Sequence, residues 1–80
     1  MYKAGDIVKF KSVDDTKLLK RQDFVTCGWN EKMNYLCEQE RVLTEETAGK
    51  LNGKACVLWT EMDKEGIPWY ISRDMIELVD

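Results

Sequence analysis

The residue types in this 80-residue chain that could support chemistry are its fifteen carboxylates and three cysteines. Two acidic pairs, Asp14–Asp15 and Glu45–Glu46, have the close spacing from which acid–base catalysis can arise. Together with Glu61, the second pair could offer three oxygen ligands to Mg²⁺. Nothing in this spacing marks a buried carboxyl group of raised pKa, and such pairs are usually solvated loop charges. We therefore expect no catalytic residue, no metal site and no cofactor.

The cysteines point away from redox, zinc and nucleophile chemistry. Cys27, Cys37 and Cys56 are odd in number and form no CxxC pair, and the chain contains no histidine. Neither a disulfide framework nor zinc ligands at the usual spacing are available, and a cysteine nucleophile would lack the histidine that normally activates it. Glycine-rich phosphate loops, HExxH and GxSxG are also missing from the sequence. We expect three reduced thiols and a protein that is not an enzyme.

Charge is distributed unevenly along the chain. The formal net charge is −3, yet residues 1–21 hold six basic and three acidic residues. The basic residues that could contact nucleic acid are Lys9, Lys11, Lys17, Lys20 and Arg21. Binding to a duplex usually needs a basic stripe that neutralises several phosphates, and an acidic chain offers one modest patch at most. The alternative is that these lysines coat the solvent side of a first strand.

Length and hydropathy favour one small cytoplasmic domain that spans residues 1–80. A chain of this length buries roughly 60–65% of the surface that its unfolded form exposes, so its core is thin. The composition, with 44% hydrophobic and 34% charged residues, is that of a globular protein. No apolar run is long enough to span a membrane, and the first residues lack the pattern of a signal peptide.

Period-two patterns predict strands at both ends of the chain. Residues 6–13 alternate, with Val8 and Phe10 on one face and lysines on the other. Residues 23–29 favour a second strand, and residues 30–40 favour one or two helical turns, with Asn30 as the cap and Met33, Leu36 and Cys37 on the buried side.

The second half of the chain reads as further strands. Residues 41–46 and 54–60 have strand composition and are separated by a loop over residues 47–53. We expect residues 54–60 to form a hairpin with residues 67–72, followed by a tight turn at 72–75 and a closing strand at 76–79. Five short strands with one helical turn predict an all-β fold, a small, strongly bent barrel.

The aromatic residues are the main candidates for contact with a partner. Trp29, Tyr35, Trp59 and Tyr70 could form a surface cluster, because tryptophan and tyrosine give a large contact area for little lost entropy. A domain this small also needs aromatic rings for its own core. Because Trp69 and Tyr70 are adjacent in a strand, they must point to opposite faces. We assign Trp69 to the core and regard Trp29 and Tyr70 as better binding candidates.

The order of these motifs resembles the small SH3-like barrel proteins encoded by phages and bacterial mobile elements, which are similar in layout to mind-bomb type domains. Gly5, Asp6 and Val8 match a Gly-Asp-x-Val opening, and Met33 and Leu36 match a Met-x-x-Leu segment. The closing motif is matched by Tyr70, Ile71, Asp74, Met75, Ile76 and Glu77. The resemblance spans nearly the whole chain and implies an SH3-like barrel that acts as a binding module, with variable loops that meet the partner.

The chain departs from that pattern in two places. Cys37 stands where a glycine commonly follows the leucine, so a cysteine there would be strained if the position needs a positive φ. The loop at residues 45–54 is longer than the pattern suggests.

We expect a non-enzymatic protein-binding module of phage or prophage origin that binds, and inhibits or redirects, a larger basic host protein. Its predicted contact residues are Trp29, Tyr35, Trp59, Tyr70, Glu45, Glu46 and Glu61. Nucleic-acid binding through the basic N-terminal third and self-association through an edge strand remain the alternatives.

Overall fold

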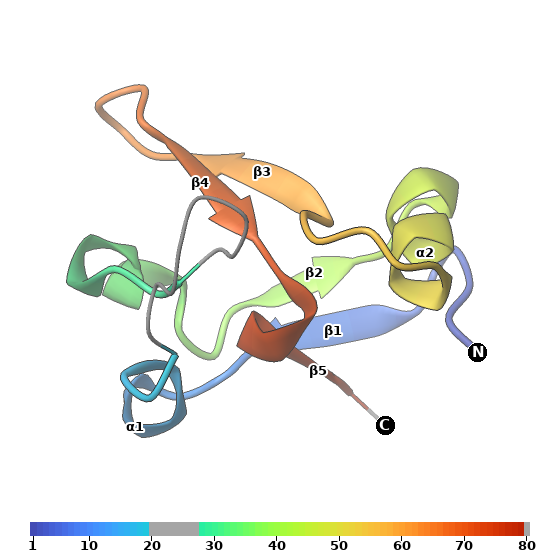
Figure 1. Cartoon of the computed structure of the whole chain (residues 1–80), viewed down its shortest axis with the longest axis horizontal. Helices are drawn as coiled ribbons and strands as arrows, with labels where there is room; N and C mark the ends of the chain where they lie inside the picture. The colour runs from blue at the N-terminus through green and yellow to red at the C-terminus, as the bar shows by residue number, and fades with distance from the viewer. Residues whose placement is uncertain (20–27, 80) are drawn as a thin grey trace.

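The computed structural model describes residues 1–19 and 28–79, which form two antiparallel sheets and several short helical segments. Figure 1 shows the second sheet lying across the first, with α2 at one end of the molecule and η1 at the other. In chain order the elements are β1 (Ile7–Phe10), α1 (Val13–Thr16), η1 (Glu31–Leu36), β2 (Glu40–Val42), α2 (Glu45–Asn52), β3 (Trp59–Met62), β4 (Pro68–Ile71), η2 (Arg73–Met75) and β5 (Ile76–Leu78).

The first sheet has β1 at its centre and joins the two ends of the chain. β1 pairs antiparallel with β2, with Val8 opposite Arg41, and on its other side with β5, where Phe10 lies opposite Ile76. The alternation predicted for β1 is confirmed, since Val8 and Phe10 are buried and Lys9 faces the other way. The predicted meeting of residues 6–11 with residues 76–79 is also confirmed.

The second sheet is the β3–β4 hairpin, and its pairing confirms the predicted hairpin. Trp59 lies opposite Ile71 and Met62 opposite Pro68. The turn is fixed by the Asp63 carboxylate, whose Oδ1 accepts the backbone N–H groups of Glu65 and Ile67 at 2.8 Å. β3 runs from Trp59 to Met62, so the predicted strand at residues 54–60 begins and ends too early.

The predicted loop at residues 47–53 is wrong, because residues 45–52 form α2 and Gly53 is its C-cap. For the same reason the predicted strand at residues 41–46 ends too late, since β2 ends at Val42. Thr44 caps the helix through a reciprocal pair of hydrogen bonds with Thr47, and Glu45 and Glu46 stand in the first turn. Ala48 and Leu51 are buried against the core. Caps at both ends and this apolar contact stabilise a helix whose glycine and threonine content alone disfavours it.

Arg73 of η2 holds the far end of α2. Its guanidinium group donates to the backbone carbonyl oxygens of Lys50, Leu51, Gly53 and Ala55, at distances between 2.9 and 3.4 Å. A cation at a helix C-terminus also interacts favourably with the helix dipole. The contact fixes α2 to the turn that leads into β5.

The helical turns at residues 30–40 are confirmed as η1, a 3₁₀ helix with Asn30 as the N-cap and Met33 and Leu36 buried, whereas Cys37 is only half-buried. Cys37, at φ −52°, is not strained; the left-handed residue is Glu38, at φ +66°. The positive φ therefore lies one position after Cys37.

The core lies between the two sheets and is centred on Phe10, which is fully buried. Leu36, Leu58, Ile71 and Met75 are other members of this cluster, and Trp29, Trp59 and Trp69 pack against it from its margin. The mainly β architecture is confirmed, and the described strands form two sheets that are not closed into a barrel. The predicted second strand, residues 23–29, lies outside the described residues except for Gly28 and Trp29, which are not in a strand.

Replacing Glu38 with glycine should raise the free energy of unfolding by about 0.5 kcal/mol. Glycine removes the left-handed strain of roughly 1–2 kcal/mol, and part of that gain is offset by a more flexible unfolded chain. Urea denaturation measures the change. The matched control is Glu40→Gly in β2, where backbone geometry is ordinary and glycine should lower stability by about 0.5–1 kcal/mol. Equal losses in both variants would contradict the strain at Glu38.

Candidate binding surface

Two of the aromatic residues predicted to contact a partner belong to the margin of the core. The ring of Phe10 lies 6.4 Å from that of Trp29 and 6.1 Å from that of Trp59, centroid to centroid, both in tilted or edge-on arrangements. Both indole N–H groups have internal acceptors: Trp29 donates to Asn34 Oδ1 at 2.7 Å and Trp59 to Glu61 Oε2 at 2.6 Å. These contacts give both tryptophans a structural role.

Glu61 is also held inside the molecule. The Arg41 guanidinium group donates through Nε and Nη2 to its two carboxylate oxygens, at 3.2 and 3.1 Å. The pair joins β2 of the first sheet to β3 of the second, and the guanidinium carbon lies 5.5 Å from the centroid of the Phe10 ring. With 17% of its side chain exposed and its charge neutralised, Glu61 contributes little to the acidic surface.

A groove of about 260 Å³ follows this pair between β2 and β3. Its lining residues are Arg41, Val42, Leu43, Thr44, Thr47, Trp59 and Glu61. The groove therefore lies between β2, an edge strand of the first sheet, and β3, an edge strand of the second. Its walls combine apolar side chains with the neutral Arg41–Glu61 pair.

The outer side of the β3–β4 hairpin carries an uncharged surface. Thr60 lies opposite Tyr70 and Met62 opposite Pro68, so these four side chains share one face, which we call the hairpin face. All four are exposed, Met62 to 65% and Tyr70 to 53%. On the opposite side, Trp69 is half-buried and Ile71 is buried. The predicted division between an inward Trp69 and an outward Tyr70 is confirmed.

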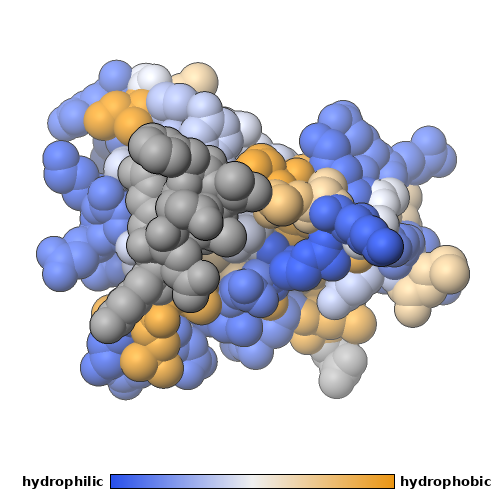
Figure 2. Space-filling model, in the orientation of Figure 1, coloured by the Kyte–Doolittle hydropathy of each residue, from blue (hydrophilic) through white to orange (hydrophobic). Residues whose placement is uncertain are grey.

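Figure 2 shows how apolar residues are distributed on one side of the molecule. They form separate patches, including one at the hairpin turn, one over α1 and one between the hairpin and α2, with hydrophilic residues around them. The four residues of the hairpin face are cross-strand neighbours, so their side chains are held in a fixed geometry.

Tyr35 is half-exposed on η1, beside the hairpin turn. It lines an open cleft of about 670 Å³ together with Lys32, Asp63, Lys64 and Glu65. Desolvation raises the pKa of the Tyr35 hydroxyl, the negative charges of Asp63 and Glu61 raise it further, and Arg41 opposes them. Tyr35 therefore offers a neutral hydroxyl group for hydrogen bonding beside the turn of the β3–β4 hairpin.

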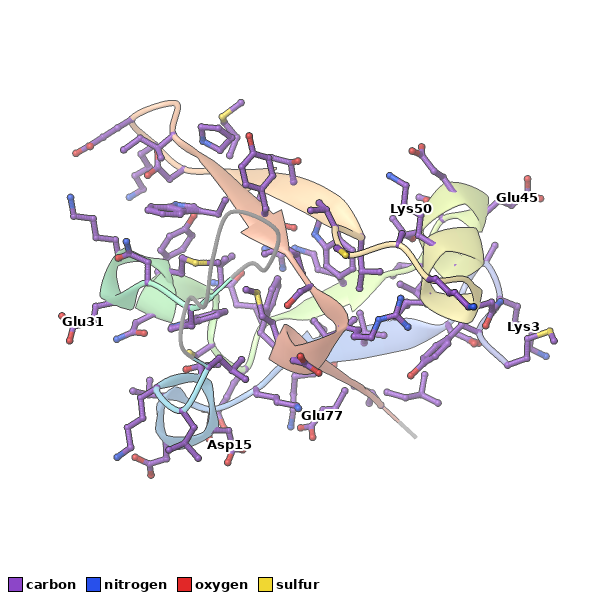
Figure 3. The ribbon with its side chains drawn as sticks, in the orientation of Figure 1. Lys3, Asp15, Glu31, Glu45, Lys50 and Glu77 are labelled. Atoms are coloured by element: carbon purple, nitrogen blue, oxygen red, sulfur yellow. The ribbon has the colours of Figure 1, made fainter. Side chains whose placement is uncertain are left out.

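Glu45 and Glu46 are exposed in the first turn of α2, and Glu46 forms an ion pair with Lys50 at 3.2 Å. Figure 3 shows Glu45 on α2 at one end of the molecule and Glu31 on η1 at the other. The predicted contact residues consequently do not form one cluster. Tyr35 and Tyr70 belong to the hairpin end, whereas Glu45 and Glu46 lie far from it.

The predicted nucleic-acid patch is partly neutralised by neighbouring carboxylates. Lys9 pairs with Glu77 at 3.7 Å and Lys17 with Asp14 at 3.3 Å, while Lys11 is half-buried. Lys20 and Arg21 lie outside the described residues. Lys9 and Lys17 therefore offer little free charge to phosphate groups.

The remaining groups with chemical potential are dispersed. Within residues 1–19 and 28–79, no three acidic or cysteine side chains are grouped so that they could hold a metal ion. Cys56 is exposed, and the sulfur of Cys37 lies 3.8 Å from the hydroxyl of Thr16. Cys27 lies outside the described residues.

Sequence reasoning missed Met62 and Pro68 as surface residues. A signal was present, since the alternation that turns Trp69 inward also turns Pro68 and Tyr70 outward. Met62 could not be assigned to this face from alternation alone, because its place there depends on the strand register that pairs it with Pro68.

Comparison of the chain with protein-family models, with curated proteins and with solved structures yields no match in any of the three. Among the helices of the described residues, none has the length and apolar character needed to cross a membrane.

The Arg41–Glu61 pair should couple the two sheets energetically. In a double-mutant cycle with Arg41→Gln and Glu61→Gln, we expect a coupling energy of about 1–2 kcal/mol, because the two-pronged pair is largely shielded from water. The exposed pair Glu46–Lys50 is the matched control and should give about 0.3–0.5 kcal/mol. Chemical denaturation measures both cycles. A coupling for Arg41–Glu61 no larger than that of the control would show that the pair does not join the sheets.

Proposed function

We propose that this protein is a small, non-enzymatic protein-binding module that engages its partner through the hairpin face. The observation that carries the proposal is the exposed, uncharged surface formed by Met62, Pro68, Tyr70 and Thr60 on a single hairpin. Its strands are fixed by cross-strand pairing and by the packing of Trp59 and Trp69 beneath, so binding orders few additional groups. Methionine and tyrosine are enriched at interfaces for their large contact area.

The partner in this proposal is a larger, basic protein. The net charge of −3 favours a positively charged counterpart. The resemblance to proteins of phages and mobile elements extends the proposal: the chain is phage or prophage encoded, acts in the host cytoplasm, and inhibits or redirects a host protein.

We also propose an SH3-like layout for the fold. The strand orders β2-β1-β5 and β3-β4 support it, because pairing between β2 and β3 would turn the two sheets into one continuous five-stranded sheet. The groove lined by both strands marks the place where this pairing is open.

The test is affinity purification of the tagged chain from the producing cell, followed by mass spectrometry and a binding assay with each purified candidate. Replacing both Met62 and Tyr70 with serine should weaken binding of the true partner by at least about a hundredfold, since buried apolar contacts at an interface centre dominate affinity.

The matched control replaces Val13 and Leu18, two other exposed apolar residues, with serine. This variant should bind as the unmodified chain does. If the two double variants lose affinity equally, or neither loses any, the hairpin face is not the contact surface. Circular dichroism and denaturation curves establish that both variants remain folded.

A further inference from the structure

The hydrogen-bonding pattern of the hairpin identifies which backbone groups of β3 face outward. Asp63 N–H donates to the carbonyl oxygen of Ile67 at 3.1 Å, next to the turn. Hydrogen-bonded pairs alternate with non-bonded pairs in an antiparallel ladder, so the next bonded pair is Glu61 with Trp69. Thr60 and Met62 therefore direct their backbone N–H and C=O groups away from β4. No strand of the described chain pairs with them.

The two edges of the hairpin are unequal. The outer edge of β4 contains Pro68, which has no N–H to donate, and a proline at an edge prevents the addition of another strand. The outer edge of β3, with Thr60 and Met62, contains no proline or glycine. An additional strand can therefore join the hairpin at β3 and not at β4.

The groove beside β3 provides room for the side chains of such a strand. Alternate residues of an added strand point to opposite sides of the sheet. One set would lie beside Met62 on the hairpin face, and the other would enter the groove, where Leu43, Val42 and Trp59 supply apolar walls. A groove of about 260 Å³ accommodates one or two aliphatic side chains.

The charge of the chain as a whole favours a basic occupant, since the formal net charge is −3. Close to this edge, Arg41 and Glu61 neutralise each other. At the hairpin turn, Asp63 and Glu65 are balanced by Lys32 and Lys64, which line the same cleft.

We propose that an extended segment of the partner, with alternating basic and aliphatic residues, adds to the free edge of β3 as a further strand. Main-chain hydrogen bonds to Thr60 and Met62 hold it, and its aliphatic side chains fill the groove between β3 and β2. This inference rests on the proposed function and specifies how the partner is gripped.

The experiment uses the full chain, labelled with ¹⁵N, and a capped peptide with the sequence Lys-Val-Lys-Val-Lys-Val. Amide hydrogen exchange is measured by NMR with and without saturating peptide. Strand addition should slow exchange at Thr60 and Met62 by at least about tenfold, whereas Tyr70, on the opposite edge, serves as the internal control and should not change. The counterpart with glutamate in place of lysine should bind at least about tenfold more weakly at low salt.

A version of the lysine peptide with every amide N-methylated keeps the side chains but cannot donate main-chain hydrogen bonds. Its binding should be lost. Equal binding by the methylated and unmodified peptides, unchanged exchange at Thr60 and Met62, or no binding of any peptide at millimolar concentration would overturn strand addition.

These outcomes are separable from those for the proposed function. If a partner binds through Met62 and Tyr70 but leaves the exchange of the Thr60 and Met62 amides unchanged, the hairpin face is the contact surface and only strand addition is wrong. If a partner binds the Met62→Ser, Tyr70→Ser variant as tightly as the unmodified chain, the proposed function itself is wrong.

Discussion

The aromatic ring of Phe10 is the contact on which the rest of this structure depends. It lies in the central strand of the first sheet, is fully buried, and touches Trp29 before η1 and Trp59 at the start of the hairpin. Arg41 lies over the same ring and reaches across to Glu61. In residues 1–19 and 28–79 no strand pairing joins the two sheets, so side-chain packing in the core, with this ring at its centre, holds them together. In a domain with so thin a core, few other residues could replace it.

The packing around Phe10 determines which side chains remain available at the surface. Trp29 and Trp59 cover Phe10, and Glu61 compensates the charge of Arg41 that would otherwise lie unpaired beside the core. Three of the predicted contact residues, Trp29, Trp59 and Glu61, are therefore engaged in internal contacts. The side chains on the outer face of the hairpin remain exposed and do not belong to the core. The unpaired gap between the sheets also leaves a groove and an open strand edge.

The sequence predicts those features that follow from the alternation of inward and outward side chains within a short segment. The alternation around Val8 and Phe10, the hairpin around Trp69 and Tyr70, and the closing strand after Arg73 all follow from it. The buried positions of Met33 and Leu36 follow from helical spacing.

Features that depend on contacts between distant residues were not predictable in this way. α2 contains one threonine and one glycine among eight residues, and it is stabilised by capping at Thr44 and by Arg73, which is more than twenty residues away from Lys50 and Leu51. Composition cannot reveal the Arg41–Glu61 pair either, because it depends on where β2 and β3 approach each other. The same contact explains why Glu61 does not act with Glu45 and Glu46 at the surface.

Native-state hydrogen exchange of a Phe10→Leu variant tests most directly whether this ring unites the sheets. A shared core predicts that the free energy of opening falls by the same amount, about 1–1.5 kcal/mol, at the hydrogen-bonded amides of β1 and at those of the hairpin. If the amides of β1 lose protection while Glu61 and Trp69 in the hairpin keep theirs, the two sheets are stabilised separately and the account is contradicted.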